Sequence, residues 1–476
     1  MTNIKKIRNM MKTTKKLFTL LLALALPAMA SALTPYSYDN YDFELDGIYY
    51  KISNDSAWVT YQRWNGDHVS NYWGAVVIPS VITYQGKTYP VTAIDTYAFK
   101  NCSGLTSVTI PESIRTIGGS AFYGCTGLTR VIITDLEAWC NADIQFNPLC
   151  YAQHLYLNDT EVTDLVIPEG ITAIKKYAFQ GCTGLKSVTI PSSVTTIGNN
   201  AFEDCTGLAA VHIPTSVTSI GECAFEGCTG LTSATLGNAI NTINMYTFSG
   251  CTALKSIRVP NSITTICTGA FNGCTSLANA SLGNSVMTIG NGAFMGCTAL
   301  SSIEIPNSVA EIGNKAFYGC TSLMSVSIGK SVVTLQKDAF QNAPSIETVI
   351  CKAVVPPVWN DMSMFMPNVY NHASLHVPCD AERAYKTNQH WGQFLTIIGD
   401  FTPDANGIVN GDVNGDGETT IADANSVIDV VIMGGNASHP RTPGKYDENN
   451  ADVNGDGEIT IADVNAVINI VVDLGQ

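Results

Sequence analysis

Residues 182–204 read CTGLKSVTIPSSVTTIGNNAFED, and residues 297–319 read CTALSSIEIPNSVAEIGNKAFYG. Both share the pattern C-x-x-L-x-x-V-x-I-P-x-S-V-x-x-I-x-x-x-A-F, with valine and isoleucine exchanged at one position. The opening cysteine recurs at a constant spacing, as at Cys182, Cys205 and Cys228, except across one longer interval between Cys125 and Cys182. Such a period is typical of a solenoid, in which stacked units bury a face that one unit alone leaves exposed. We therefore expect one structural unit, stacked about a dozen times.

Each unit predicts a short strand followed by a turn. In LKSVTI, we expect Leu185, Val188 and Ile190 to point inward, because the last two alternate as in a half-buried strand. Pro191 ends the strand, since proline has no N–H to donate to a ladder. Phenylalanines at one register are expected to form a buried aromatic row. They are Phe99, Phe122, Phe179, Phe202, Phe225, Phe248, Phe271, Phe294, Phe317 and Phe340.

The unit resembles the leucine-rich repeat of BspA-like bacterial surface proteins. Leu105, Val108 and Ile110 match L-x-x-L-x-L, and the match continues from Val76 to Cys351. The resemblance implies a curved, β-rich α/β solenoid that adheres to host proteins at a cell surface. The longer interval resembles a longer repeat of this family, for which we expect a helix near 136–141 and a strand at 154–157.

The N-terminus has the order of a secretory signal peptide. Lys12, Lys15 and Lys16 precede LFTLLLALALPAMASA, an apolar run that ends in small residues. A membrane anchor is the alternative, but the core at 17–26 is short for a bilayer of about 30 Å. We expect an exported protein, secreted or held at the cell surface. Its expected parts are a signal peptide (1–32), an N-terminal β cap with the first repeat (33–100), the repeat solenoid (101–351), a C-terminal cap (352–400), a linker (401–410) and a tail module (411–476).

The cysteines allow two interpretations. Fifteen cysteines in an exported chain suggest a disulfide framework. Nine of them share one register of the repeat, however, where a reduced cysteine serves as a small buried residue. We favour reduced thiols there. Two pairings stay open, namely Cys140 with Cys150, and Cys223 or Cys267 with neighbouring cysteines.

The solenoid predicts binding rather than catalysis. The net charge of −15 argues against nucleic acid, whose phosphates need basic partners. Outward strand positions such as Ser107, Thr109, Ser187 and Thr189 are small and hydroxylated, so a protein ligand is expected, with an inert spacer as the alternative. No motif for catalytic or cofactor-binding residues is found. Four residues could be grouped as metal ligands, but we disfavour this interpretation. His376 alternates with Leu375 and Val377 on a predicted strand, and Cys351 occupies a core register of the repeat. The members of this metal set are Cys351, His372, His376 and Cys379.

The C-terminus carries a repeated loop. Residues 412–423 read DVNGDGETTIAD, and residues 452–463 read DVNGDGEITIAD. Oxygen-bearing residues at loop positions 1, 3, 5, 7, 9 and 12, with glycine at position 6, form the pattern of an EF-hand-type calcium loop. We therefore expect two Ca²⁺ ions. The expected ligands are Asp412, Asn414, Asp416, Glu418, Thr420 and Asp423 in the first loop, and Asp452, Asn454, Asp456, Glu458, Thr460 and Asp463 in the second.

A helix-like apolar segment follows each loop, and the twelfth loop position is aspartate rather than the usual glutamate. Residues 411–476 thus resemble a type I dockerin, a small all-α domain that folds on calcium and docks on a cohesin-type partner. The loops start forty residues apart, and Ile421-Ala422 and Ile461-Ala462 occupy the positions where dockerins read their partner. The expected partner is therefore a cohesin-like protein or a surface receptor, and a calcium-stabilised cap is the alternative.

Three functions follow from this organisation. The first is a non-enzymatic adhesion protein, whose solenoid binds a protein and whose tail attaches it. The second is a non-catalytic component of an extracellular polysaccharide-degrading complex, docked through the tail. The third is an enzyme concealed in the capped body, which no sequence motif supports.

Overall fold

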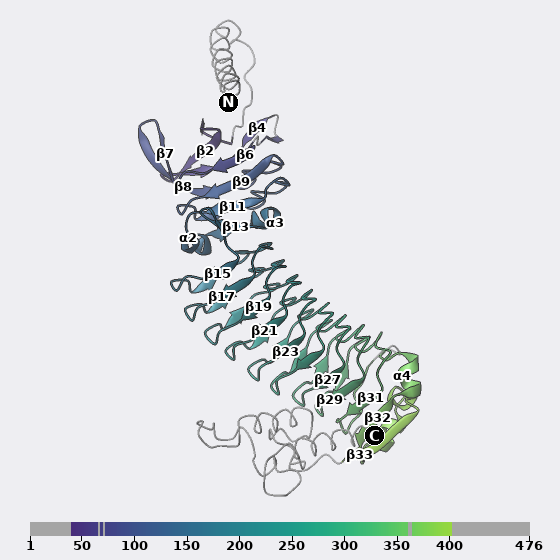
Figure 1. Cartoon of the computed structure of the whole chain (residues 1–476). Helices are drawn as coiled ribbons and strands as arrows, with labels where there is room; N and C mark the ends of the chain where they lie inside the picture. The colour runs from purple at the N-terminus through teal and green to yellow at the C-terminus, as the bar shows by residue number, and fades with distance from the viewer. Residues whose placement is uncertain (1–39, 65–66, 70–71, 360–363, 402–476) are drawn as a thin grey trace, which may run out of the picture.

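The computed structural model describes residues 40–64, 67–69, 72–359 and 364–401, and it shows a curved solenoid of stacked strands (Figure 1). Most turns of the solenoid contribute one longer strand and one two-residue strand. Two α-helices interrupt the stack near its N-terminal end, and a cap with two further α-helices covers its C-terminal end. The expected β-rich leucine-rich-repeat fold is confirmed for these residues.

The longer strands pair in parallel, each residue lying beside the equivalent residue of the next repeat. Val131 lies beside Val108, and Val326 lies beside Ile303, so the register of the ladder follows the period of the sequence. Leu185, Val188 and Ile190 are buried, as predicted. The longer strands are β9 (Leu105–Ile110), β11 (Arg130–Ile133), β13 (Leu155–Leu157), β15 (Asp164–Val166), β17 (Ser187–Thr189), β19 (Ala210–His212), β21 (Ser233–Thr235), β23 (Ser256–Arg258), β25 (Asn279–Ser281), β27 (Ser302–Ile305), β29 (Ser325–Ile328) and β31 (Thr348–Cys351).

The short strands form a second parallel ladder across the repeats. In each of them the second residue, usually isoleucine, is buried. They are β10 (Thr116–Ile117), β12 (Asp143–Ile144), β16 (Ala173–Ile174), β18 (Thr196–Ile197), β20 (Ser219–Ile220), β22 (Thr242–Ile243), β24 (Thr265–Ile266), β26 (Thr288–Ile289), β28 (Glu311–Ile312) and β30 (Thr334–Leu335).

A left-handed backbone position precedes the Ala-Phe pair of most repeats. Its φ values lie between 53° and 65°, a region that costs an L-residue about 1–2 kcal/mol and glycine little. Two repeats use glycine there, whereas others hold a side chain. The residues are Tyr97, Ser120, Tyr177, Asn200, Cys223, Tyr246, Gly269, Gly292, Lys315 and Asp338.

The predicted aromatic row is confirmed and forms the axis of the core. From Phe179 to Phe340, each buried ring stacks on the next, and Phe365 of the cap continues the row. The ring centroids along this row are 5.1 to 5.7 Å apart. Phe99 and Phe122 stack in the same way at 4.8 Å. Parallel rings at this spacing lie within the range of favourable aromatic contacts, so the row links successive repeats.

The buried cysteines stand next to this row and have a specific role. The Sγ atom of Cys205 donates a hydrogen bond of 3.2 Å to the carbonyl oxygen of Phe179, one repeat earlier. The same carbonyl also accepts the N–H of Cys182. The thiol therefore satisfies a second lone pair of a buried carbonyl, which an alanine in its place would leave without a donor. The contact recurs at Cys125, Cys228, Cys251, Cys274, Cys297 and Cys320.

The long repeat contains the two N-terminal helices. Helix α2 (Leu136–Asn141) begins at Asp135, whose side chain accepts a hydrogen bond from the N–H of Ala138. The helix lies where it was predicted, and the predicted strand is β13. Helix α3 (Leu149–Ala152) and strand β14 (Thr160–Glu161) complete this repeat.

The N-terminal cap consists of short strands. Two hairpins turn at Asp46-Gly47 and Gln85-Gly86. The strands are β1 (Phe43–Leu45), β2 (Ile48–Ser53), β3 (Ser56–Val59), β4 (Gln62–Trp64), β5 (Asp67–Val69), β6 (Gly74–Val77), β7 (Val81–Tyr84) and β8 (Lys87–Ile94).

The C-terminal cap extends the sheet of longer strands and closes its end. Strands β32 (Ser374–Pro378) and β33 (Thr396–Phe401) add in parallel to β31. Around them are α4 (Pro367–His372), α5 (Glu382–Thr387) and a 3-10 helix, η1 (Trp391–Gln393). Trp391 is buried among aromatic rings and donates its indole N–H to the carbonyl of Pro357 at 2.8 Å. The cap thus covers the last phenylalanine of the row.

Candidate functional site

The outward side chains of the longer strands form one continuous surface, which we call the strand face. Because side chains alternate along a strand, the residues between the inward Leu, Val and Ile point to solvent. Those at the centre of the solenoid are exposed. The strand face comprises Ser107, Thr109, Arg130, Ile132, Asp164, Val166, Ser187, Thr189, Ala210, His212, Ser233, Thr235, Ser256, Arg258, Asn279, Ser281, Ser302, Glu304, Ser325 and Ser327.

Charges on the strand face are few, and two of them lie against local partners. The Arg130 guanidinium lies 4.2 Å from the centroid of the Tyr156 ring. Glu304 pairs with Lys352 at 3.3 Å across two repeats. Between these two pairs the surface is mainly hydroxyl-bearing. Such a surface offers hydrogen bonds along its whole length rather than one charged anchor, which suits an extended protein contact.

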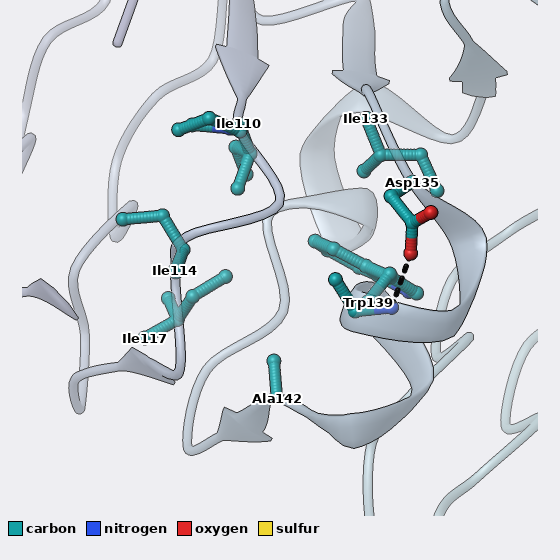
Figure 2. A pocket seen from close by; sticks show the side chains of 9 residues that line it. Ile110, Ile114, Ile117, Ile133, Asp135, Trp139 and Ala142 are labelled. Carbon is teal, nitrogen blue, oxygen red and sulfur yellow. Dashed lines mark hydrogen bonds between the residues drawn. The ribbon is translucent and has the colours of Figure 1, made fainter. Parts of the chain in front are cut away.

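Two hollows lie beside the long repeat, one small and one more open. Figure 2 shows one of about 10 Å³, enclosed by Ile110, Ile117, Ile133 and Trp139, room for one water at most. A more open hollow lies beside it, lined by Arg115, Asp135, Glu137, Ala138 and Asn141. Asp135 accepts a hydrogen bond from the N–H of Ala138 as the cap of α2, as Figure 2 shows, so its role is in helix structure.

The residues of the disfavoured metal set have separate partners. The Cys351 thiol is hydrogen-bonded to the Tyr385 hydroxyl, and Cys379 donates to the carbonyl of Gly399. His372 bonds to the carbonyl of Asn368. Within the described ranges, no cluster of three or more His, Cys, Asp or Glu residues could hold a metal ion.

All fifteen cysteines have free thiols in this structure, so neither open pairing is formed. In the repeats, burial raises the pKa of the Cys274 and Cys320 thiols to about 12. A thiol that stays protonated is a poor nucleophile for disulfide exchange. The reduced, structural interpretation of the repeat cysteines agrees with this environment.

The predicted calcium ligands, from Asp412 to Asp463, lie outside the described residues.

Sequence reasoning missed one group of hydrogen-bonded polar side chains within the described residues. His376, placed above among improbable metal ligands, bonds to Ser374 at 2.9 Å and to Asp400 at 2.6 Å. The Ser-x-His spacing within one strand was a usable signal, because such residues share a face. Asp400 could not be foreseen, since only the pairing of β32 with β33 brings it there.

Comparison with known protein families identifies the chain. The family model described as "BspA type Leucine rich repeat region" matches in six copies at residues 85–140, 152–277 and 241–358, more than half of the chain. The chain belongs to the BspA-type leucine-rich-repeat family. The model "Dockerin type I domain" matches residues 410–472, so the tail resembles that module. No curated protein matches the chain.

Solved structures of bacterial leucine-rich-repeat proteins resemble this BspA-type chain. One is a leucine-rich repeat protein from Bacteroides ovatus, with 28% identity, a TM-score of 0.48, and coverage of 71% of this chain and 79% of that chain. Another is a leucine rich cell surface protein from Faecalibacterium prausnitzii, with 27% identity, a TM-score of 0.42, and coverage of 65% and 94%.

Both matched modules are types that mediate protein–protein interaction and are typical of extracellular or surface proteins. Type I dockerin domains bind calcium as a class. None of the helices described in the structure has the length and apolar character needed to cross a membrane.

Proposed function

We propose that this protein is an exported, non-enzymatic adhesion protein, whose strand face binds a protein ligand and whose calcium-folded tail attaches it to a partner. The observation that carries the proposal is the strand face itself. Its exposed small side chains stand on a core in which, from Phe179 to Cys320, each repeat is joined to the next by a stacked phenylalanine and a thiol hydrogen bond. A rigid, extended surface rich in hydroxyl groups is suited to recognising another folded protein.

The tail supplies the attachment in this proposal. Its two loops place carboxylate, amide, hydroxyl and carbonyl oxygens at the positions a hard cation needs, and the dockerin model matches over 410–472. From Asp404 to the last residue, the chain contains thirteen acidic and two basic side chains, a concentration of negative charge that favours Ca²⁺. We expect two ions, held by the twelve residues named above, with a cohesin-like protein or a surface receptor as the partner.

The dockerin match also favours a second function. In it, the protein is a non-catalytic component of an extracellular polysaccharide-degrading complex, and the tail docks it on a cohesin-bearing scaffold. The two functions differ in what the tail binds. Calcium-dependent binding to a cohesin domain favours the second, whereas binding of the solenoid to host matrix proteins favours the first.

Calorimetric titration of calcium into the full chain tests the tail. We expect two ions to bind, with a rise in helical circular dichroism. In the double variant Asp412→Ala and Asp452→Ala, which removes the first ligand of each loop, binding should be lost. The matched control is Asp404→Ala with Asp473→Ala, which removes the same charge outside the loops and should still bind two ions. Absence of binding at millimolar calcium, or equal loss in both double variants, would overturn the proposed calcium sites.

A further inference from the structure

Three polar residues of the C-terminal cap form a hydrogen-bonded chain that the binding function does not use. Ser374 and His376 stand two residues apart on β32, so their side chains share one face of the strand. Asp400 lies on β33, which pairs in parallel with β32. The Ser374 Oγ atom is 2.9 Å from His376 Nε2, and His376 Nδ1 is 2.6 Å from an Asp400 carboxylate oxygen.

The hydrogen-bond partners assign the imidazole tautomer. An ionised carboxylate only accepts hydrogen bonds, so Nδ1 of His376 carries the proton that Asp400 receives. In the neutral ring, Nε2 then has a free lone pair, and at 2.9 Å it is a closer acceptor for the Ser374 hydroxyl proton than the Glu347 carbonyl oxygen at 3.5 Å. This is the arrangement of a nucleophile, a general base and a residue that orients the base.

The surroundings shield the base and leave the hydroxyl partly accessible. His376 is 2% exposed, and the register places Ile350 and Ile398 on either side of it. Ser374 is half-buried, with Thr348 and Thr396 beside it in the same row. An apolar setting strengthens the two hydrogen bonds, while a reagent can still approach the serine from the strand face.

We propose that Ser374 is a nucleophilic serine, activated by His376 and positioned by Asp400, that accepts the acyl group of a carboxylic ester. Ser374 Oγ forms a bond to the ester carbonyl carbon as its proton passes to His376 Nε2. The carbon–oxygen bond to the leaving alcohol then breaks, and the alcohol takes that proton. Ser374 is left acylated, the imidazole is neutral again, and Asp400 stays ionised throughout.

The structure provides an internal control for this proposal. Ser325 occupies the register of Ser374 two strands earlier, since Ser325 pairs with Thr348 and Thr348 pairs with Ser374. Two residues after Ser325 stands Ser327, where His376 stands in the cap. Ser325 therefore has a similar place on the sheet without the imidazole, and it reports the reactivity of an ordinary serine.

A fluorophosphonate probe, which reacts with activated serines, tests the proposal on the full chain. Peptide mapping by mass spectrometry should find the adduct on Ser374, at a rate at least about 100-fold above Ser325, the range that a general base supplies. This comparison within one folded chain needs no variant. Equal labelling of Ser374 and Ser325, or labelling of neither, would overturn the proposal.

Variants then separate activation from structure. Ser374→Ala should remove the adduct, and His376→Gln should lower its rate about 100-fold. Asp400→Asn should reduce labelling, and Asp400→Glu should restore part of it, because a carboxylate again orients the ring. With p-nitrophenyl acetate, the natural chain should release about one p-nitrophenolate per chain in a rapid burst, the signature of an acylated nucleophile. If Asp400→Asn lowers thermal stability but leaves labelling and burst unchanged, Asp400 has no positioning role.

Discussion

The regular repeats and the C-terminal cap bury similar kinds of apolar surface by different means. Between Cys182 and Cys320 the same two contacts, a stacked phenylalanine and a thiol hydrogen bond, recur from one repeat to the next. In the cap, each contact is made once. Trp391 packs on Trp359 and Tyr385, and the Tyr385 hydroxyl donates to the carbonyl of Ala353.

This difference indicates which functions the repeats and the cap can each serve. A repeated contact gives a uniform rod whose strength depends on coupling between neighbours. A contact made once can end the rod and can also hold unlike groups in a fixed geometry, as the Ser374–His376–Asp400 chain does. Specialised chemistry is therefore expected in the cap, and broad recognition along the repeats.

The largest predicted effect breaks the coupling between repeats. Phe248 stacks on Phe225 at 5.5 Å and on Phe271 at 5.7 Å. Replacing it with alanine leaves a cavity and removes the stacking partner of both neighbouring rings. We therefore expect Phe248→Ala to lower the free energy of unfolding by about 3–5 kcal/mol. Urea unfolding followed by circular dichroism measures this loss, and Phe248→Leu is the control with a smaller cavity. A loss below about 1 kcal/mol would show that the row does not join the repeats.

Alkaline pH should destabilise the repeats through their thiols. Burial raises the pKa of Cys274 and Cys320 from 9.0 to about 12, so the unfolded chain releases these protons first as pH rises. Their stabilisation is complete below pH 9 and is lost between pH 9 and 12. At pH 10 the loss is about 1.4 kcal/mol for each thiol, or about 3 kcal/mol for the pair. The free energy of unfolding should be measured at pH 8 and pH 10. Its fall between these two pH values should be about 3 kcal/mol smaller when both cysteines are replaced by alanine.

A matched pair of tyrosines sharpens the comparison within the cap. Tyr385 donates to Ala353 at 2.7 Å, so Tyr385→Phe should cost about 1–2 kcal/mol by leaving a buried carbonyl without its donor. The buried Tyr370 hydroxyl has only a weak backbone contact with Phe365, so Tyr370→Phe should cost less than about 1 kcal/mol. Thermal unfolding compares the two, and equal effects would show that single contacts do not determine the stability of the cap.

The smallest effect concerns the left-handed position of the repeats. Cys223 holds φ at 54°, where Gly269 and Gly292 serve two later repeats. Cys223→Gly should therefore stabilise the chain by up to about 1 kcal/mol in thermal unfolding. Asn200→Gly offers a second test with a residue that tolerates this conformation better, so its gain should be smaller. Destabilisation by Cys223→Gly would mean that its side-chain contacts outweigh the backbone strain.

The difference between repeated contacts and contacts made once also explains which features could be predicted from the sequence. Repeated features are visible as periods, so the inward Leu185 and Val188, the phenylalanine row and the buried thiols were all predictable. Helix α2 was predicted from the resemblance of the longer interval to a longer repeat of the family, and the structure shows that Asp135 caps it. The continuation of the row by Phe365 and the contact of Asp400 with His376 were not, because they depend on chain packing that occurs once. The calcium loops stay a prediction from spacing and family resemblance.

Binding to a panel of immobilised extracellular matrix proteins, with strand-face variants of the full chain, tests the central claim most directly. Ser233→Arg with Ser256→Arg places two bulky charges at exposed positions of the strand face, on β21 and β23. Thr218→Arg with Asn241→Arg adds the same charge at exposed positions before β20 and β22. The account predicts that the natural chain binds a matrix protein, that the strand-face variant loses at least about tenfold in affinity, a difference of about 1.4 kcal/mol, and that the control does not. Undiminished binding by the strand-face variant would contradict it.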